Sequence, residues 1–238
     1  MRNVLIFLLS LFSLLCNGQS PKLFTTDKEL SSSLINQIYQ DRNGFIWIAT
    51  EDGLNRYDGA KFTIYKHEPN NEHSLAHNFV RTVFEDSKGH LLIGTYIGIQ
   101  MYDPATDNFT PLAKLEDTGE TLESNINSFI ERKNGEIWVS GNVLCKLNIK
   151  DHLLTVRKVD IAVTSPGSLF EDKKQNVWMA KGEEGVYQLT PDNQLTLHLS
   201  KDNGYVKSIC EDQRGNIYVG SIRKGLFIYD KERKTFVP

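Results

Sequence analysis

The sequence has 238 residues, of which 39% are hydrophobic, 24% charged and 10% aromatic, a profile typical of a folded polypeptide that excludes a disordered or fibrous one. Its 27 Lys and Arg residues against 30 Asp and Glu residues give a formal net charge of -3. No basic footprint for a phosphate backbone is therefore present, and nucleic acid is not expected as a partner. Only 3 Cys residues also exclude a disulfide scaffold.

Residues 1–18 have the pattern of a secretory signal peptide. One positive charge precedes the apolar run Val4–Leu15, and small side chains at Cys16 and Gly18 suit cleavage after Gly18. The run is shorter than the roughly 20 apolar residues that a membrane-spanning helix needs. Residues 19–238 are therefore predicted to be exported to the periplasm, with an uncleaved anchor helix or acylation of Cys16 as the alternatives.

A repeat of about 40 to 46 residues runs through the rest of the chain, and periods of this length indicate a solenoid, a propeller or an array. In each copy, the first recurring segment, which we call the first box, is a polar turn followed by an apolar strand. Its five copies are Asp41–Trp47, Asp86–Leu92, Arg132–Trp138, Asp172–Trp178 and Asp212–Tyr218. A second box follows each first one at a near-constant distance, in the copies Asp52–Asp58, Ile97–Asp103, Val143–Leu147, Glu184–Leu189 and Lys224–Asp230.

Each copy divides into four short segments with the period-2 alternation of strands. In the first copy these segments are residues 35–40, 45–50, 54–57 and 62–65. Asp41 can bond its own backbone and Gly44 can adopt a positive φ, so a tight hairpin is expected between the first two strands. The sequence therefore predicts an all-β fold with almost no helix, in which each copy is one four-stranded antiparallel blade of a β-propeller. The five blades are expected at about residues 24–67, 68–113, 114–159, 160–199 and 200–238.

The recurrent aromatic and acidic residues have a structural interpretation. The rings of Trp47, Trp138, Trp178 and Tyr218 are expected to fill the gaps between neighbouring sheets rather than to stack on a ligand. The Asp residues that begin the first boxes are expected to act in turns. A catalytic acid and base must converge within about 5 to 10 Å, whereas equivalent positions in different blades are spread around a ring. Cys145 and Cys210 lie in apolar strand-like segments and are expected to be buried.

The segment Gln40–Gly59 resembles the two-component regulator propeller repeat, and the resemblance covers about residues 20–238. It is similar to the N-terminal periplasmic sensor region of Bacteroides-type hybrid two-component systems. In that family two seven-bladed propellers precede an immunoglobulin-like domain, a membrane helix, a histidine kinase core, a receiver and a DNA-binding domain. The resemblance implies that a glycan fragment is sensed and that polysaccharide-utilisation genes respond.

The printed sequence ends after the fifth repeat and contains no kinase motif. We therefore expect this chain not to be an enzyme, and to be the front portion of a longer sensor or a truncated or split gene product. The expected partners are a small ligand, the remaining blades and the kinase of the parent sensor, and a second copy through open blade edges. We expect an open arc of a seven-bladed propeller, with closure of five blades among themselves as the alternative.

Recognition is expected on the face that carries the loops between second and third strands and between blades, because these loops vary in length. Near the start of the inner strands, polar residues recur that could line the mouth of the axial channel or simply be solvated. These residues are Asn36, Arg81, Asn127 and Lys207. An oligosaccharide site needs planar polar groups and an aromatic platform, which favours Arg81, Tyr96, Asn142 and Arg223.

Other chemistry is weakly represented. His67, His73 and His77 share one polar loop without a carboxylate or Cys pair at ligand spacing, so no metal site is expected. No phosphate-binding loop, dinucleotide fingerprint or nucleophile elbow occurs, so no cofactor is expected. The alternatives to a sensor are a lyase-like or glycosidase-like propeller enzyme and a secreted protein-docking propeller. A glycosidase is disfavoured because Asp41 and Gly44 are three residues apart, whereas sialidase-type repeats place them two apart.

Overall fold

The computed structural model describes residues 23–26, 29–199 and 204–238. The signal peptide predicted at residues 1–18 lies outside these residues. The described part is built from 21 strands and contains no helix, and thus no helix long and apolar enough to cross a membrane.

The strands form five sheets in chain order, four of them with four strands and one with five. The first sheet contains β1 (Ile35–Gln40), β2 (Ile46–Thr50), β3 (Gly53–Tyr57) and β4 (Phe62–Tyr65), and the second contains β5 (Val80–Glu85), β6 (Leu91–Thr95), β7 (Ile99–Asp103) and β8 (Asn108–Phe109). The third contains β10 (Ser128–Glu131), β11 (Ile137–Ser140), β12 (Leu144–Lys150), β13 (Leu153–Lys158) and the added β9 (Lys114–Leu115), which pairs parallel with β13. The fourth contains β14 (Leu169–Glu171), β15 (Val177–Lys181), β16 (Gly185–Leu189) and β17 (Leu195–Leu199), and the fifth contains β18 (Tyr205–Glu211), β19 (Ile217–Ile222), β20 (Gly225–Asp230) and β21 (Thr235–Val237).

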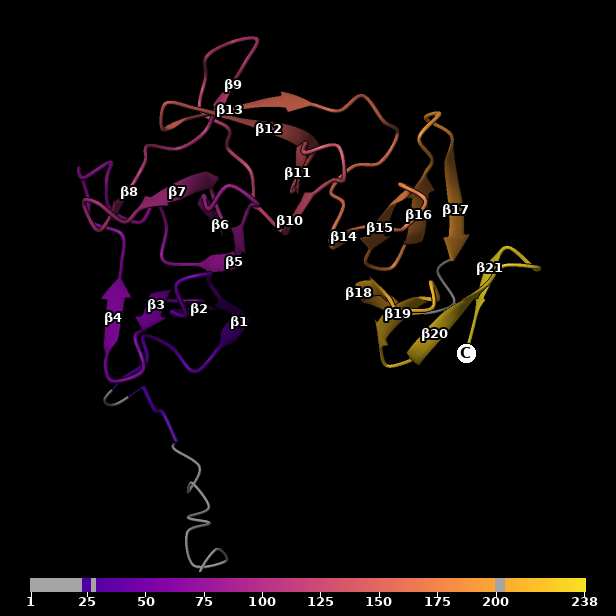
Figure 1. Cartoon of the computed structure of the whole chain (residues 1–238), viewed down its shortest axis with the longest axis horizontal. Coiled ribbons are helices and arrows are strands. Elements are labelled where there is room, and N and C mark those ends of the chain that lie inside the picture. Colours follow the sequence, from indigo (N-terminus) through magenta and orange to yellow (C-terminus); the bar gives the residue numbers. More distant parts are fainter. Residues whose placement is uncertain (1–22, 27–28, 200–203) are drawn as a thin grey trace, which may run out of the picture.

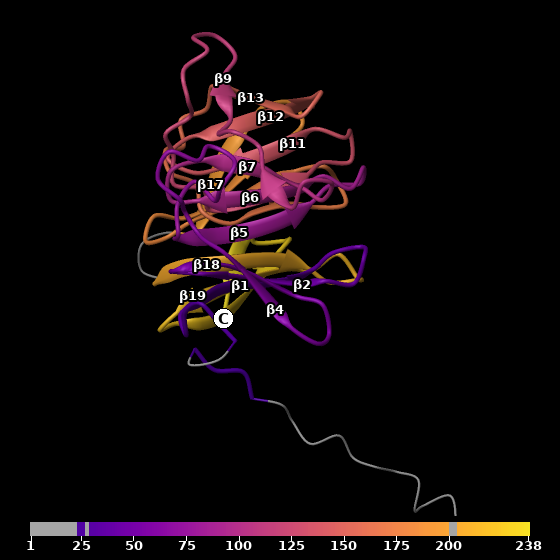
Figure 2. The same cartoon turned by 90° about the vertical axis from the view of Figure 1, so that its left-hand side faces the viewer.

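The five sheets stand side by side as blades around an arc (Figures 1 and 2). The arc is open between the sheet β1–β4 and the sheet β18–β21 (Figure 1). Consecutive strands pair antiparallel within each blade. The predicted all-β propeller of five blades in an open arc is therefore confirmed.

The turn between the first two strands of a blade is fixed by its leading Asp. Oδ1 of Asp41 accepts the backbone N–H groups of Asn43 and Phe45, both at 3.0 Å, while Gly44 has a φ of 88°. The same double acceptance recurs at Asp86, Asp172 and Asp212. The Asp residues thus hold turns, as predicted.

Tryptophan side chains fill the gaps between blades, as expected from their spacing. Trp47 is fully buried, and its ring lies edge-on to that of Tyr102 in the next blade, with ring centroids 4.9 Å apart. Its indole N–H donates to Oδ2 of Asp41 at 2.8 Å. Trp178 repeats both features with Tyr229 and Asp172. One Asp therefore both forms the turn and satisfies the buried indole.

The third blade has Arg132 where the others have Asp, and a second acidic residue compensates for the change. The indole N–H of Trp138 donates to Oε2 of Glu136 at 3.0 Å, and the Arg132 guanidinium lies over the indole ring at 4.6 Å. Lys146 donates to Oε1 of Glu136 at 2.6 Å. This hydrogen bond is the main reason that the pKa of Glu136 falls from 4.5 to about 2.

A glutamate at the end of the inner strand fastens the second, third and fourth blades each to the turn of the blade before it. The residue after the turn-forming Asp or Arg donates its backbone N–H to this glutamate at 2.7 to 2.8 Å. The pairs are Arg42 with Glu85, Ser87 with Glu131 and Lys133 with Glu171. We call this contact the glutamate clasp, and it joins consecutive blades only.

The two described cysteines are both free. Cys145 is buried between the second and third blades, and burial raises the pKa of its thiol to about 11. The prediction that Cys210 is buried is wrong, because Cys210 is exposed. It lies on the inner strand β18 of the fifth blade, beyond which the arc is open.

Candidate functional site

The turns between second and third strands and the linkers between blades meet on one face of the arc, which we call the loop face. In the first blade, Gly53 donates its N–H to the carbonyl of Asn78 at 2.7 Å. The side-chain amide of Asn78 donates to Oδ1 of Asp52 at 3.0 Å. In the second blade, Tyr96 donates its N–H to the carbonyl of Phe79 at 3.0 Å. Turns and linkers are thus bound to each other, and the opposite face carries the Asp turns.

β-Bulges place the predicted channel residues at the start of the inner strands. The strand register shifts between Ile35 and Gln37, between Val80 and Thr82, and between Val206 and Ser208. The extra residues in these three bulges are Asn36, Arg81 and Lys207. A bulge redirects its side chain, and here the same device recurs in three blades. The sequence pattern thus identified a recurrent structural position.

Two of the predicted channel residues are occupied by contacts between blades. The side-chain amide of Asn36 donates to the carbonyl of Val80 at 2.8 Å, and that of Asn127 donates to the carbonyl of Pro166 at 3.0 Å. Both bonds cross from one blade to the next. The side-chain amides of Asn36 and Asn127 therefore link consecutive blades, whereas Lys207 is exposed to solvent.

The structure brings Arg81 and Tyr96 together in one cluster on the second blade, which we call the aromatic patch: His77, Phe79, Arg81 and Tyr96. The exposed ring of Tyr96 lies 5.5 Å from the His77 ring and 6.1 Å from the Phe79 ring, measured between centroids. The Arg81 guanidinium carbon lies 5.3 Å from the Phe79 ring centroid. His77 and Phe79 were not identified as site residues from the sequence, although both lie shortly before Arg81 in the chain.

Asn142 and Arg223 lie elsewhere on the loop face. Asn142 is exposed and borders a hollow of about 590 Å³ beside Lys158. Arg223 borders a larger cleft of about 890 Å³ between the fourth and fifth blades. This blade 4–5 cleft also contains Tyr205, half of whose surface is exposed. The four residues predicted for a sugar site thus form three separate places instead of one.

Tyr205 is the aromatic residue of the blade 4–5 cleft, and it was not predicted as a site residue from the sequence. Its ring lies against Gly182, where an added Cβ would come within 2.9 Å of the ring. Lys181 in the same cleft pairs with Glu184 at 2.8 Å. Tyr205 occupies the position of Phe79 in the repeat, just before the bulge, and this equivalence was the available signal.

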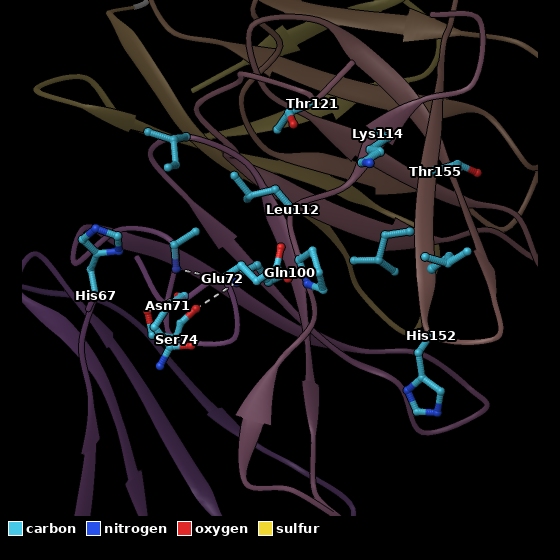
Figure 3. A pocket seen from close by; sticks show the side chains of 15 residues that line it. His67, Asn71, Glu72, Ser74, Gln100, Leu112, Lys114, Thr121, His152 and Thr155 are labelled. Atoms are coloured by element: carbon cyan, nitrogen blue, oxygen red, sulfur yellow. Dashed lines mark hydrogen bonds between the residues drawn. The ribbon is translucent and has the colours of Figure 1, made fainter. Parts of the chain in front are cut away.

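A third cavity of about 670 Å³ opens at the rim between the second and third blades. Figure 3 shows His67, Asn71 and Ser74 on one side of it and Lys114, Thr155 and His152 on the other, with Gln100 and Leu112 between them. The Gln100 amide is saturated, because its oxygen accepts from Ala76 and its nitrogen donates to the carbonyls of Ser74 and Thr110. Gln100 therefore has a structural role in the wall of this cavity. No group of three or more potential metal-ligating side chains occurs in the described ranges.

The repeat family described as "Two component regulator propeller" matches residues 29–52, 74–96 and 200–223. Histidine kinase P4 of Formosa agariphila is 39% identical to this chain over 83 residues, which are 32% of this chain and 6% of that protein. The chain therefore spans a small part of this curated relative.

Among solved structures, the extracellular domain of a putative hybrid two-component system from B. thetaiotaomicron aligns with a TM-score of 0.73 and 18% identity, over 92% of this chain and 33% of that chain. Virginiamycin B lyase from Staphylococcus aureus aligns with a TM-score of 0.65 and 12% identity, over 92% of this chain and 72% of that one. At these identities the likeness concerns the fold. The chain therefore contains two-component regulator propeller repeats, and these repeats lie in propeller blades.

Proposed function

We propose that the chain is the ligand-sensing propeller of a hybrid two-component sensor, and that it binds an oligosaccharide on its loop face outside the cytoplasm. The observation that carries this proposal is the loop face itself. On blades built from two-component regulator propeller repeats, this face holds the exposed Tyr96 beside Arg81 and the cleft that contains Tyr205 and Arg223. Aromatic platforms beside planar polar groups suit sugar rings and their hydroxyl groups.

The proposal assigns the signalling step to a histidine kinase in the parent protein. A histidine kinase elsewhere in the parent would convert ligand binding into transcription of polysaccharide-utilisation genes. Support comes from the curated relative, which is a histidine kinase, and from the structural neighbours, which are extracellular domains of sensors. The same neighbours support a periplasmic location for the propeller.

Further blades would complete the ring in the proposed parent. Ile38 on the first blade is 61% exposed, whereas the equivalent Val83 on the second blade is buried against its neighbour. Leu226 on the fifth blade is 62% exposed, whereas the equivalent Leu54 on the first is buried. The two ends of the arc thus present the same apolar faces that form the interior contacts.

A propeller lyase is the second candidate, favoured by the fold likeness to virginiamycin B lyase. A lyase of this kind would need histidines and carboxylates that converge on one face. Here His67 and His73 bond backbone carbonyls through Nδ1, and His90 pairs at 2.7 Å with Asp86, which is a turn residue on the face opposite the loops. The side-chain arrangement therefore favours binding over proton transfer.

The test incubates the chain with a panel of neutral and acidic oligosaccharides and follows both the melting temperature and product formation. A sensor is stabilised by its ligand through binding linkage and leaves the ligand intact. The expected result is a saturable rise in melting temperature with at least one saccharide and no product. Consumption of that saccharide at a measurable rate would favour the lyase, and the absence of any stabilisation would contradict the saccharide-sensing proposal.

A further inference from the structure

Two buried side-chain polar atoms in the described part of the chain have no hydrogen-bond partner, Nε of Arg81 and Oδ1 of Asn125. Both belong to segments bound to the same turn between β6 and β7. The carbonyl of Phe79 accepts the N–H of Tyr96, and the carbonyl of Thr95 accepts the N–H of Ile126, each at 3.0 Å. An unpaired donor and an unpaired acceptor therefore flank the turn that carries Tyr96. Such atoms are rare in folded proteins and call for a specific explanation.

Arg81 differs from Arg56 and Arg132, two other partly buried arginines, because no carboxylate in the described part of the chain pairs with it. Arg56 pairs with Asp107 at 2.9 Å, and Arg132 pairs with Glu171 at 2.8 Å. Arg81 is half-buried and has no carboxylate within ion-pair distance among the described residues, and its visible support is the Phe79 ring at 5.3 Å. A partly desolvated guanidinium without an anion is costly. The site thus lacks the carboxylate that pairs with Arg56 and with Arg132.

Hydrogen bonds to the backbone on the N-terminal side of Arg81 fix the start of β5. Arg81 is the extra residue of the bulge between Val80 and Thr82, and the amide of Asn36 donates to the carbonyl of Val80 at 2.8 Å. His77 accepts the N–H of Phe79 at Nδ1, at 2.9 Å, so the neutral His77 ring carries its proton on Nε2. The aromatic patch therefore offers a guanidinium, an imidazole N–H and an exposed phenol ring together.

We propose that the aromatic patch binds the uronic-acid residue of an acidic saccharide, with its carboxylate on Arg81 and its sugar ring against Tyr96. This inference rests on the proposed sensing function and names the class of its ligand. The N–H groups of a guanidinium form a planar fork that matches a carboxylate. The carboxylate of the ligand thereby supplies the anion that Arg81 lacks among the described residues.

The experiment compares each acidic saccharide with its own uncharged counterpart. Trisaccharides of galacturonic, glucuronic and mannuronic acid, and the same compounds after reduction of their carboxyl groups, are titrated into the full chain by calorimetry. The variants are Arg81→Gln, Tyr96→Ala and, as the charge-matched control, Arg157→Gln. Arg157 is exposed on β13 of the third blade, away from the aromatic patch. Melting temperatures without saccharide show that each variant is folded.

At least one uronate is expected to bind about tenfold or more tightly than its reduced counterpart, and Arg81→Gln is expected to abolish this preference. Tyr96→Ala should weaken both forms, and Arg157→Gln should bind like the unchanged protein. Equal binding of the acidic and reduced forms, or an acid preference that survives Arg81→Gln, would overturn the inference. If neutral saccharides bind in that case, the proposed sensing function still stands. If no saccharide of either kind binds, both proposals fail.

Discussion

The carboxylate of Asp172 shows how much one side chain contributes to a blade. It accepts hydrogen bonds from the backbone N–H groups of Lys174 and Asn176 and from the indole of Trp178, at 2.8 to 2.9 Å. Asp172→Ala would leave these donors unpaired in a buried turn. We expect this change to lower the free energy of unfolding by about 2–4 kcal/mol. Urea denaturation measures the loss, with the exposed Asp117→Ala as the control. A loss equal to that of the control would contradict this account of the turn.

Glu136 gives the third blade a dependence on acid pH. The hydrogen bond from Lys146 holds the pKa of Glu136 at about 2, below the value of 4.5 that it has when unfolded. A depressed carboxyl pKa contributes stability that is fully present above 4.5 and is lost as the pH falls toward 2. Glu136→Gln should therefore reduce the fall in unfolding free energy between about pH 6 and pH 3. The matched control is Glu123→Gln at an exposed site, and equal slopes for the two variants would refute the prediction.

The role of a residue was predictable from the sequence where that residue acts within one blade. It was not predictable where the residue bonds to the next blade. The turn-forming Asp residues and the buried tryptophans follow from spacing within a blade, and both are confirmed. The amides of Asn36 and Asn127 were expected at a ligand channel, yet they bond the backbone of the next blade. The glutamate clasp was missed, although a Glu directly precedes the turn in four of the five copies. Its partner lies about 40 residues away in the sequence, which single-copy reasoning does not reach.

In the second strand of each blade, the residue at the position of Gly94 must have a small side chain or none. In β6, an added Cβ on Gly94 would lie 2.6 Å from methyl carbons of both Thr82 and Ile126. Overfilling such a contact forces neighbouring side chains or backbone to move. We expect Gly94→Val to cost about 1–3 kcal/mol of unfolding free energy, whereas Thr196→Val on the exposed part of β17 should change it by less than about 0.5 kcal/mol. Thermal unfolding of both variants checks this, and a Gly94→Val protein as stable as the parent would disprove it.

Strand boundaries were predicted more closely than the elements between blades. The first blade was expected at residues 35–40, 45–50, 54–57 and 62–65, and β1 to β4 differ from these ranges by at most one residue. The short β9 was not predicted, because its two residues pair parallel with β13 of the third blade from an irregular linker. The three clefts were also beyond prediction. Their walls combine linkers of unequal length, and no repeat pattern fixes how such linkers fold.

The whole molecule is an arc with two apolar ends. Ile38 and Leu226 lie on these ends, more than half exposed, at positions that are buried in the interior blades. We expect the isolated chain to associate as its concentration rises, and the double variant Ile38→Lys and Leu226→Lys to remain monomeric under the same conditions. Sedimentation velocity measures the association. Leu153→Lys serves as the control, because Leu153 is equally exposed on the outer hairpin of the third blade. Association unchanged in the double variant would place the contact elsewhere.

The glutamate clasp also affects how a gene for this repeat protein can gain or lose repeats. The turns of the first three blades each offer a backbone donor, and the inner strands of the second to fourth blades each offer a glutamate acceptor. If recombination removed the second unit, the turn at Arg42 would meet Glu131 in place of Glu85, and the joint would keep its chemistry. Repeat units of this kind are interchangeable. Tandem duplication or loss of a unit therefore alters the number of blades but keeps the donor and acceptor at each contact between them.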